Sequence, residues 1–244
     1  MHAEEYARMH DLEDHYWWFV GRRNVALKLL RNFTKGKPTV LDLGCGTGII
    51  SEELSHWSKP ISLDMSELAL AFSKSRGIVD LVQARGEWLP LRSGSVDAVL
   101  ALDVFEHVEN DGAALKEAFR VLRPGGVLVL SVPAFKSLWG PHDVALMHFR
   151  RYTRALMRSR LKDAGFQIPR LSYSVFFLFP VVVLIRAMEK MKRGEPHASL
   201  PKVPNWFNRA LIGLQNFEAA IIAKFSLPWG SSVLAVAKKP GKAE

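Results

Sequence analysis

The 244-residue sequence contains a single cysteine, so the chain cannot form an internal disulfide. Disulfides persist in oxidising compartments, and a chain without one is expected in the reducing cytoplasm. The first fourteen residues are polar and include five acidic side chains, which is not the pattern of a secretory signal. We also find no internal repeat and no low-complexity tract, which excludes repeat architectures and indicates an ordinary globular chain.

Long apolar runs are scarce too. The apolar run at 175–185 is eleven residues long and contains Pro180. A helix needs about 20 apolar residues to span a bilayer, so this run predicts a buried or interfacial segment and not a crossing. Basic residues outnumber acidic ones, and the net charge of +9 at pH 7 suits three partners: nucleic acid, an anionic membrane or an acidic substrate.

What the sequence does contain is a regular alternation of predicted strands and helices between residue 39 and about residue 174. This alternation predicts a doubly wound α/β fold, in which helices cover both faces of a mostly parallel, seven-stranded sheet. The predicted strands are 40–43, 61–64, 80–83, 98–102, 127–132 and 167–173, with 232–237 as an edge strand that completes the sheet. The predicted helices are 50–57, 66–76, 112–122 and 153–164.

Two segments fall outside this alternation. The N-terminal segment is helical in pattern and contains the aromatic cluster Y-W-W-F, and an insertion with a second helical pattern at 206–225 separates the last two strands. We therefore divide the chain into a helical arm (1–35), a core (36–174), a helical insertion (175–231) and a last strand with the tail (232–244).

The most informative motif is the run V-L-D-L-G-C-G-T-G at the end of the first strand. Gly44, Gly46 and Gly48 let the backbone turn sharply and let a ligand lie against main-chain N–H groups. Nucleotide-type cofactors bind at such strand-to-helix turns of doubly wound sheets. The third glycine comes one residue earlier than in the dinucleotide fingerprint G-x-G-x-x-G, and Asp42 lies inside the motif. We interpret Cys45 as a small residue tolerated in this turn and not as a nucleophile.

The motif resembles the first motif of class I S-adenosylmethionine-dependent methyltransferases. An E-x-L-P turn at 87–90 and an E-H-V segment at 106–108 follow it, so that residues 39–133 are similar to this family. The resemblance implies a Rossmann-like methyltransferase fold, S-adenosylmethionine as cofactor and transfer of its methyl group. More narrowly, the chain resembles a bacterial subgroup whose substrates are mostly unassigned, through the segments 16–19, 21–23, 137–143, 148–153 and 227–230.

The resemblance and the spacing together imply how the cofactor is held. The glycines leave room for its methionine part, and Asp64, 22 residues after Asp42, is placed to accept both ribose hydroxyls. Alternatively, Asp64 only stabilises the start of the next helix. The adenine is expected against residues 83–90 and the amino-acid head against residues 103–108. The candidate cofactor-binding residues are Trp17, Arg22, Asp42, Gly44, Cys45, Gly46, Gly48, Asp64, Met65, Gly86, Glu87, Trp88, Asp103, Val104 and His107.

One position departs from the family pattern. The turn before E-x-L-P usually reads G-D-A, and its aspartate receives the adenine amino group, whereas this chain has Arg85 there. Arginine has no acceptor atom. Either Glu87 or a backbone carbonyl therefore takes this contact, or the adenine contact is weaker.

The aromatic arm has two interpretations. Trp17, Trp18 and Phe19 pack the arm onto the sheet, or one of them covers the cofactor with its aromatic face near the sulfonium charge. Arg22 either pairs with the cofactor carboxylate or is a solvated helix residue. His107 either lies near the cofactor, as the resemblance implies, or has a structural role.

Methyl transfer mainly needs an acceptor held in line with the methyl group, because the electrophile is already activated. A base is needed when the acceptor arrives protonated, and His142, Asp143, His148 and Tyr152 follow the fifth strand. We take His142, His148 and Tyr152 as candidate catalytic residues. The alternative is that His148 and its arginine neighbours only order this loop. We assign no metal site from the sequence.

Basic residues follow the apolar run of the insertion directly: Arg186, Lys190, Lys192 and Arg193. Because such a combination suits an anionic membrane surface, residues 175–193 are a candidate for peripheral membrane contact. The alternatives are a lid over the active site and a dimer contact. We favour a lid that also binds an apolar substrate or a lipid surface.

These observations favour a methyltransferase that acts on a small molecule, with a lipid-like or otherwise apolar acceptor preferred over a small polar one. An RNA methyltransferase is the weaker alternative, because no recognised RNA-binding appendage accompanies the positive charge. A non-catalytic, cofactor-binding scaffold is the third hypothesis, and the Arg85 departure allows it. We expect a monomer or a homodimer that is cytoplasmic or membrane-associated.

Overall fold

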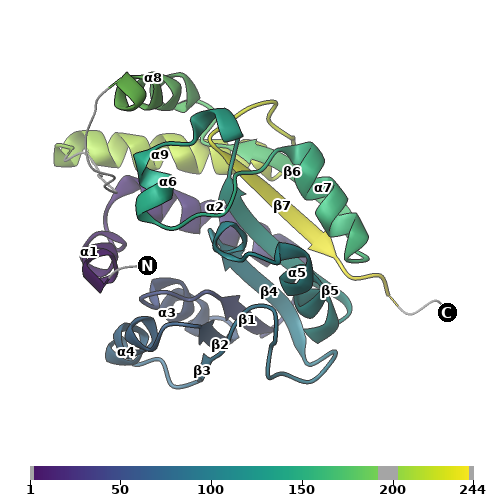
Figure 1. Ribbon diagram of the computed structural model, residues 1–244. Helices are drawn as coiled ribbons and strands as arrows, with labels where there is room; N and C mark the ends of the chain where they lie inside the picture. The colour runs from purple at the N-terminus through teal and green to yellow at the C-terminus, as the bar shows by residue number, and fades with distance from the viewer. Residues whose placement is uncertain (1–2, 192–202, 242–244) are drawn as a thin grey trace.

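The computed structural model describes residues 3–191 and 203–241, and their seven strands form one sheet (Figure 1). The strand order is β3-β2-β1-β4-β5-β7-β6, in which only the pairs made by β7 are antiparallel. The predicted doubly wound, mostly parallel fold is therefore confirmed. The strands are β1 (Thr39–Leu43), β2 (Lys59–Asp64), β3 (Leu81–Gln83), β4 (Val96–Leu102), β5 (Leu122–Pro133), β6 (Gln167–Ser174) and β7 (Ser232–Lys238).

The position of β7 corrects one expectation. The segment 232–237 is not an edge strand, because β7 pairs with β5 on one side and with β6 on the other. All of its residues except the last are buried, since neighbouring strands flank it and helices cover both faces of the sheet. The edge of the sheet on this side is β6.

The four predicted core helices begin and end within two residues of their predicted ranges, whereas α6 was not predicted. Ser66, Asn110 and Thr153 each accept a hydrogen bond from the backbone N–H three residues further on, which fixes the starts of three helices. The core helices are α3 (Ile49–Ser55), α4 (Glu67–Ser75), α5 (Asp111–Val121), α6 (Pro141–Ala145) and α7 (Arg154–Asp163), with short 3₁₀ turns η1 (Phe105–His107) and η2 (Lys136–Leu138).

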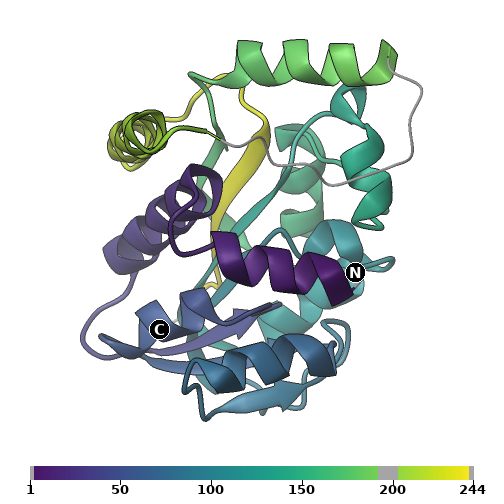
Figure 2. The same ribbon diagram turned by 90° about the vertical axis from the view of Figure 1, so that its left-hand side faces the viewer.

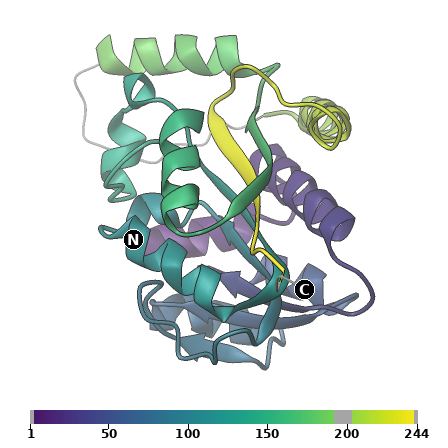
Figure 3. The same cartoon turned by 90° about the vertical axis from the view of Figure 1, so that its right-hand side faces the viewer.

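Helices lie on both faces of the sheet and build two apolar cores. On one face α5 and α7 pack against β1, β4, β5 and β7 through Leu115, Met157 and Leu161. On the other face α2 (Trp17–Phe33), α3 and α9 (Asn205–Ile222) pack against the same strands through Leu30, Leu54 and Ile222. Figure 3 shows α7 and α2 on opposite sides of β7.

The N-terminal arm is helical, as predicted, and consists of α1 (Ala3–Leu12) and α2. Helix α2 packs beside α9, and the two are joined by a hydrogen bond from the Trp17 backbone N–H to Asn208. Helix α1 leaves this layer and packs on α4, above which it lies in Figure 2.

The insertion between β6 and β7 carries α8 (Phe179–Met191) and α9. The predicted apolar run forms much of α8, whereas the predicted basic residues Lys192 and Arg193 lie outside the described residues. In the described part of the chain, no helix combines the length and the apolar character needed to cross a membrane.

Candidate active site

The glycine motif forms a tight turn between β1 and α3. Gly44, Gly46 and Gly48 have φ values of 70°, 57° and 91°, which glycine adopts without the strain that other residues meet there. A Cβ at Gly44 would lie 2.5 Å from Val104 Cγ2, and one at Gly48 would lie 2.9 Å from the Ser73 Cα. The turn is therefore shaped by close approaches that exclude side chains.

Two carboxylates stand at the base of this turn. Asp42 is buried and accepts a hydrogen bond from Ser51 of α3 over 2.6 Å. Asp64 ends β2, and its carboxylate accepts from the backbone N–H groups of Gly46 at 3.0 Å and Ser66 at 2.9 Å. Asp64 thus contacts both the glycine turn and the start of α4, which is consistent with the helix-start role, while its role toward the ribose stays a prediction.

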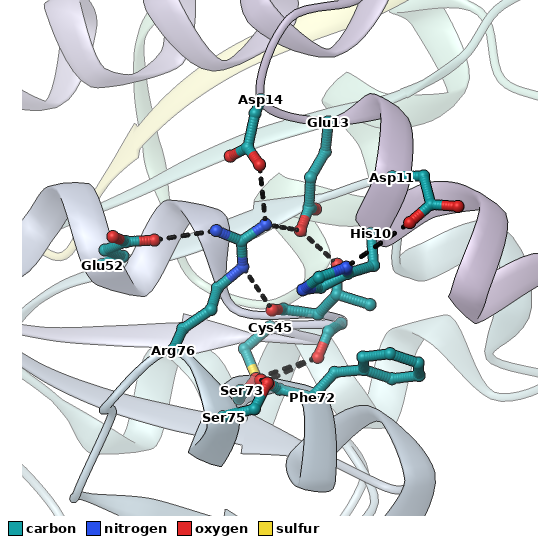
Figure 4. Close-up of polar contacts among 12 residues, drawn as sticks. His10, Asp11, Glu13, Asp14, Cys45, Glu52, Phe72, Ser73, Ser75 and Arg76 are labelled. Atoms are coloured by element: carbon teal, nitrogen blue, oxygen red, sulfur yellow. Dashed lines mark hydrogen bonds and ion pairs between the residues drawn. The ribbon is translucent and has the colours of Figure 1, made fainter.

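Helix α1 lies against the glycine turn. A Cβ at Gly46 would lie 2.9 Å from Met9 Cε, and Glu13 accepts a hydrogen bond from the Thr47 hydroxyl. Arg76, at the end of α4, donates to Glu13 at 2.9 Å and to the Thr47 carbonyl at 3.0 Å (Figure 4). The arm is thereby attached to the turn by a buried ion pair.

The Glu13–Arg76 pair has further partners. Arg76 also reaches Asp14 at 3.3 Å and Glu52 at 2.9 Å, which Figure 4 shows around the guanidinium group. Burial raises the pKa of Glu13, while the hydrogen bonds from Thr47 and Arg76 oppose this rise. Our sequence reasoning did not find this pair, because no local pattern connects two residues 63 positions apart.

The segment expected to meet the adenine follows β3. Gly86 and Glu87 are partly buried, whereas Met65 and Trp88 are exposed. Arg85, which replaces the aspartate usual in the family, is exposed and approaches Glu87 at 3.5 Å. Glu87 is therefore beside the position that the family uses, with free acceptor capacity on its carboxylate.

The residues after β4 approach the glycine turn. Asp103 has a positive φ of 55° and pairs with the Arg22 guanidinium of α2, and Val104 packs against Gly44. Arg22 therefore has a carboxylate partner. Its guanidinium carbon also lies 5.7 Å from the centroid of the Phe19 ring. Trp17 packs in the aromatic cluster of α2 and joins α9 through its backbone, which supports the packing interpretation of the arm.

The candidate catalytic residues lie in and after α6. His142 is partly buried, and burial together with the nearby Arg186 charge lowers its pKa to about 4. His148 shares a hydrogen bond of 2.9 Å with Asp143 through Nδ1. Tyr152 is fully buried, and its hydroxyl donates toward the Phe105 carbonyl and Asp111, which leaves no exposed face for a substrate.

Cys45 behaves as a small buried residue. Its Sγ lies 3.7 Å from Ser73 Oγ, and burial raises the pKa of the thiol far above its usual range. A thiol that stays protonated is a poor nucleophile. The geometry therefore supports the interpretation of Cys45 as a spacer in the turn.

The sheet order and the glycine turn at the end of β1 define a doubly wound, cofactor-binding domain. A methyltransferase domain model matches residues 41–130. An uncharacterized methyltransferase of Mycobacteroides abscessus is 31% identical over 176 residues, which cover 69% of this chain and 67% of that protein. A probable S-adenosylmethionine-dependent methyltransferase of Mycolicibacterium smegmatis is 32% identical over 160 residues, or 64% of this chain. The matched region spans 61% of that relative.

Solved structures share the same fold. A chain in a complex of the Haloferax volcanii Trm112 methyltransferase activator with a methyltransferase superimposes with a TM-score of 0.65 at 20% identity, covering 99% of this chain and 96% of that one. A methyltransferase of Thermotoga maritima gives 0.62 at 19% identity, covering 97% and 95%. The chain belongs to the class I S-adenosylmethionine-dependent methyltransferases, and its cofactor is S-adenosylmethionine.

The first prediction concerns Asp64. If its carboxylate accepts both ribose hydroxyls, Asp64→Ala should weaken S-adenosylmethionine binding by about 2–3 kcal/mol, the usual contribution of charge-assisted hydrogen bonds. Calorimetric titration measures this loss, and a melting curve checks that the fold survives. Asp80→Ala, which removes an exposed carboxylate directly before β3, is the control. An unchanged dissociation constant for Asp64→Ala would leave only the role at the start of α4.

The second prediction concerns Asp42, whose pKa burial raises to about 7. Between about pH 4 and pH 7 the folded protein holds a proton at Asp42 that the unfolded chain releases, so the contribution of Asp42 to stability falls as pH rises. Asp42→Asn should remove this dependence and raise the free energy of unfolding at pH 8 by about 2–4 kcal/mol. Urea unfolding at pH 5 and pH 8, without cofactor, measures the difference. If the free energy of unfolding changed with pH in the same way in the unmodified chain and in Asp42→Asn, this prediction would be refuted.

Proposed function

We propose that this methyltransferase transfers the methyl group of S-adenosylmethionine to a small, apolar or lipid-like acceptor. The observation that carries this proposal is the position of α8, whose apolar side chains are exposed beside the loop of the candidate base. Arg186 of α8 lies 3.7 Å from the position of a Cβ at Gly140, and Gly140 precedes α6. Figure 2 shows α8 above α6.

The exposed surface of α8 is unusually apolar for a helix of a water-soluble domain. Leu184 is 61% exposed. Large exposed apolar patches mark sites of interaction with ligands, proteins or membranes. The large apolar side chains exposed in the described part of the insertion are Phe177, Val181, Val183, Leu184, Ile185, Met188, Trp206, Phe207, Phe217, Phe225 and Trp229.

In this proposal the glycine turn, Asp64 and the segment around Glu87 hold the cofactor, and the acceptor enters between α6 and α8. We take His142 as the candidate base, because Tyr152 is fully buried and His148 Nδ1 is held by Asp143. The lowered pKa of His142 leaves its imidazole neutral at pH 7 but makes it a weak proton acceptor. Positioning of the acceptor in line with the methyl group supplies most of the rate.

The acceptor class can be tested directly. The protein is incubated with S-adenosylmethionine carrying a labelled methyl group and with bacterial extract, which is then separated into organic-soluble, RNA and small polar fractions. We expect label in the organic-soluble fraction. Label in RNA would favour the RNA methyltransferase hypothesis, and no transfer to any fraction would favour the scaffold hypothesis.

The third prediction is that the insertion attaches the protein reversibly to anionic membranes. Each basic residue near such a surface contributes about 1 kcal/mol, and salt screens this attraction. Burial of apolar side chains of α8 adds a part that salt does not screen, so high salt should release only some of the bound protein. Co-sedimentation with anionic and neutral liposomes at low and high salt measures both parts.

A matched pair of variants identifies the surface responsible. Leu184→Asp places a charge on the exposed face of α8, whereas Val79→Asp places one at an apolar residue that is 86% exposed beside β3. Only Leu184→Asp should reduce sedimentation with anionic liposomes. If the unmodified protein stays in the supernatant at low salt, the insertion is a substrate lid or a dimer contact instead.

A further inference from the structure

Three potential metal ligands converge just beyond the end of β4. Glu106 and His107 belong to η1, and His148 comes from the loop after α6. One ligand atom from each of the three side chains lies within 4.8 Å of the other two. The rings of His107 and His148 meet edge to face, with their centroids 4.6 Å apart.

Glu106 is the most unusual member of this group. Its side chain is fully buried, and neither carboxylate oxygen has a hydrogen-bond partner among the described residues. A buried carboxyl group without partners is costly, because it loses its hydration and receives nothing in exchange. The carboxylates near it are already paired, Asp103 with Arg22 and Asp143 with Arg151.

His148 is oriented as metal-binding histidines are. Asp143 is buried and receives hydrogen bonds from Arg151, from the Gly140 backbone N–H and from His148 Nδ1 at 2.9 Å. A carboxylate held in this way can only accept, so His148 carries its proton on Nδ1 and presents the lone pair of Nε2. Metal-ligating histidines usually donate their second ring N–H to a carboxylate or a carbonyl in this manner.

We propose that Glu106, His107 and His148 bind a divalent transition-metal ion, for which Zn²⁺ is the best match. Two imidazoles and one carboxylate suit Zn²⁺ and its neighbours better than Mg²⁺ or Ca²⁺, which prefer oxygen ligands. Ligand atoms at about 2.1 Å from a common ion lie roughly 3–4 Å apart, so side-chain rotation suffices to close the site. Three protein ligands leave a coordination position open for water or another small ligand.

The proposed site lies between the glycine turn and the candidate base. Val104, two residues before Glu106, packs against Gly44, and the Phe149 backbone N–H donates to the Glu106 carbonyl at 2.7 Å. The inference goes beyond the proposed function, because ion binding does not depend on which acceptor is methylated. Sequence spacing did not suggest the site, since His148 follows His107 by 41 positions.

The test uses the full chain without an affinity tag, after treatment with a chelator and in the absence of cofactor and acceptor. Calorimetric titration with Zn²⁺ should show saturable binding of one ion per chain, and titration with Co²⁺ should give the visible absorption of a bound ion. Glu106→Gln and His148→Ala should each weaken binding by at least about tenfold to a hundredfold. Asp143→Asn removes the group that positions His148, and we expect a loss in the same range.

His56→Ala, which removes an exposed histidine far from this cluster in sequence, is the control and should bind Zn²⁺ as the unmodified chain does. Far-UV circular dichroism and melting curves of each variant separate loss of ligands from loss of the fold. Glu106→Gln keeps the shape of a protonated glutamic acid, so it should fold even where other variants do not. Absence of saturable Zn²⁺ binding by the unmodified chain would overturn the proposal. So would Zn²⁺ binding by Glu106→Gln and His148→Ala that is as tight as that of the unmodified chain. Methyl transfer would be unaffected by that outcome, so the two proposals can fail separately.

Discussion

Gly46→Arg is expected to abolish S-adenosylmethionine binding, with a loss of at least about a hundredfold in affinity, or ~2.7 kcal/mol. Gly46 has a φ of 57°, and a side chain there would meet Met9 of α1 and enter the space above the turn. Calorimetry with S-adenosylmethionine and S-adenosylhomocysteine measures the loss. The unmodified chain should bind both of these ligands and not NAD. The reason is that the third glycine comes one residue earlier than in the dinucleotide fingerprint G-x-G-x-x-G.

Gly36→Arg is the matched control. Gly36 has a similar φ of 63°, but apart from its two chain neighbours no described residue has a heavy atom within 4 Å of the position of its Cβ. Both variants therefore carry the same backbone strain, and only Gly46→Arg obstructs the turn. Equal affinity of the two variants, or tight NAD binding by the unmodified chain, would show that the turn does not hold this cofactor.

Arg76→Ala should lower the free energy of unfolding by about 3–5 kcal/mol, the usual cost of removing one partner from a buried ion pair. The Glu13 side chain is only 4% exposed, so without Arg76 it must either hold an uncompensated buried charge or take up a proton, and both cost stability. Chemical unfolding monitored by circular dichroism measures the effect. Arg158→Ala, at an exposed position of α7, is the control and should change stability by about 0.5 kcal/mol or less.

A double variant tests the cause of this loss. Glu13→Gln removes the charge that Arg76 neutralises, so Glu13→Gln with Arg76→Ala should be less destabilised than the sum of the two single changes. Strict additivity would mean that Arg76 stabilises the fold through Asp14, Glu52 or packing instead. A loss below about 1 kcal/mol for Arg76→Ala alone would show that the pair contributes no more than a surface salt bridge.

The parts of the fold that sequence reasoning predicted are those specified by local patterns. Apolar runs next to glycines gave the strands and the turn at Gly44, and capping residues such as Ser66 gave the helix starts within two residues. The placement of two candidate site residues was predicted in the same way. Asp64 ends β2 and Asp103 follows β4, and the carboxyl ends of parallel strands lie at one edge of the sheet. The binding roles of these residues stay predictions.

What sequence reasoning missed depends on contacts between distant segments. The pairing of Glu13 with Arg76, and the approach of His148 to Glu106, follow from how α1 and the α6 loop cross the ends of the strands. The order of strands is equally non-local: an apolar alternation at 232–237 indicates a strand but does not say which neighbours it will have. Tyr152 illustrates the same limit, because only its complete burial separates a structural hydroxyl from an exposed one.

The central position of β7 has a consequence for synthesis on the ribosome. Among the described residues, β6 pairs within the sheet with β7 alone, yet Ser174 at the end of β6 is translated well before Ser232 at the start of β7. While the insertion is being made, β6 has no strand to pair with, and the side of β5 that β7 will cover is also open. Unpaired strands of this kind favour aggregation of nascent chains. Slow translation of the insertion should therefore lower the yield of folded protein more than slow translation of the first 130 residues.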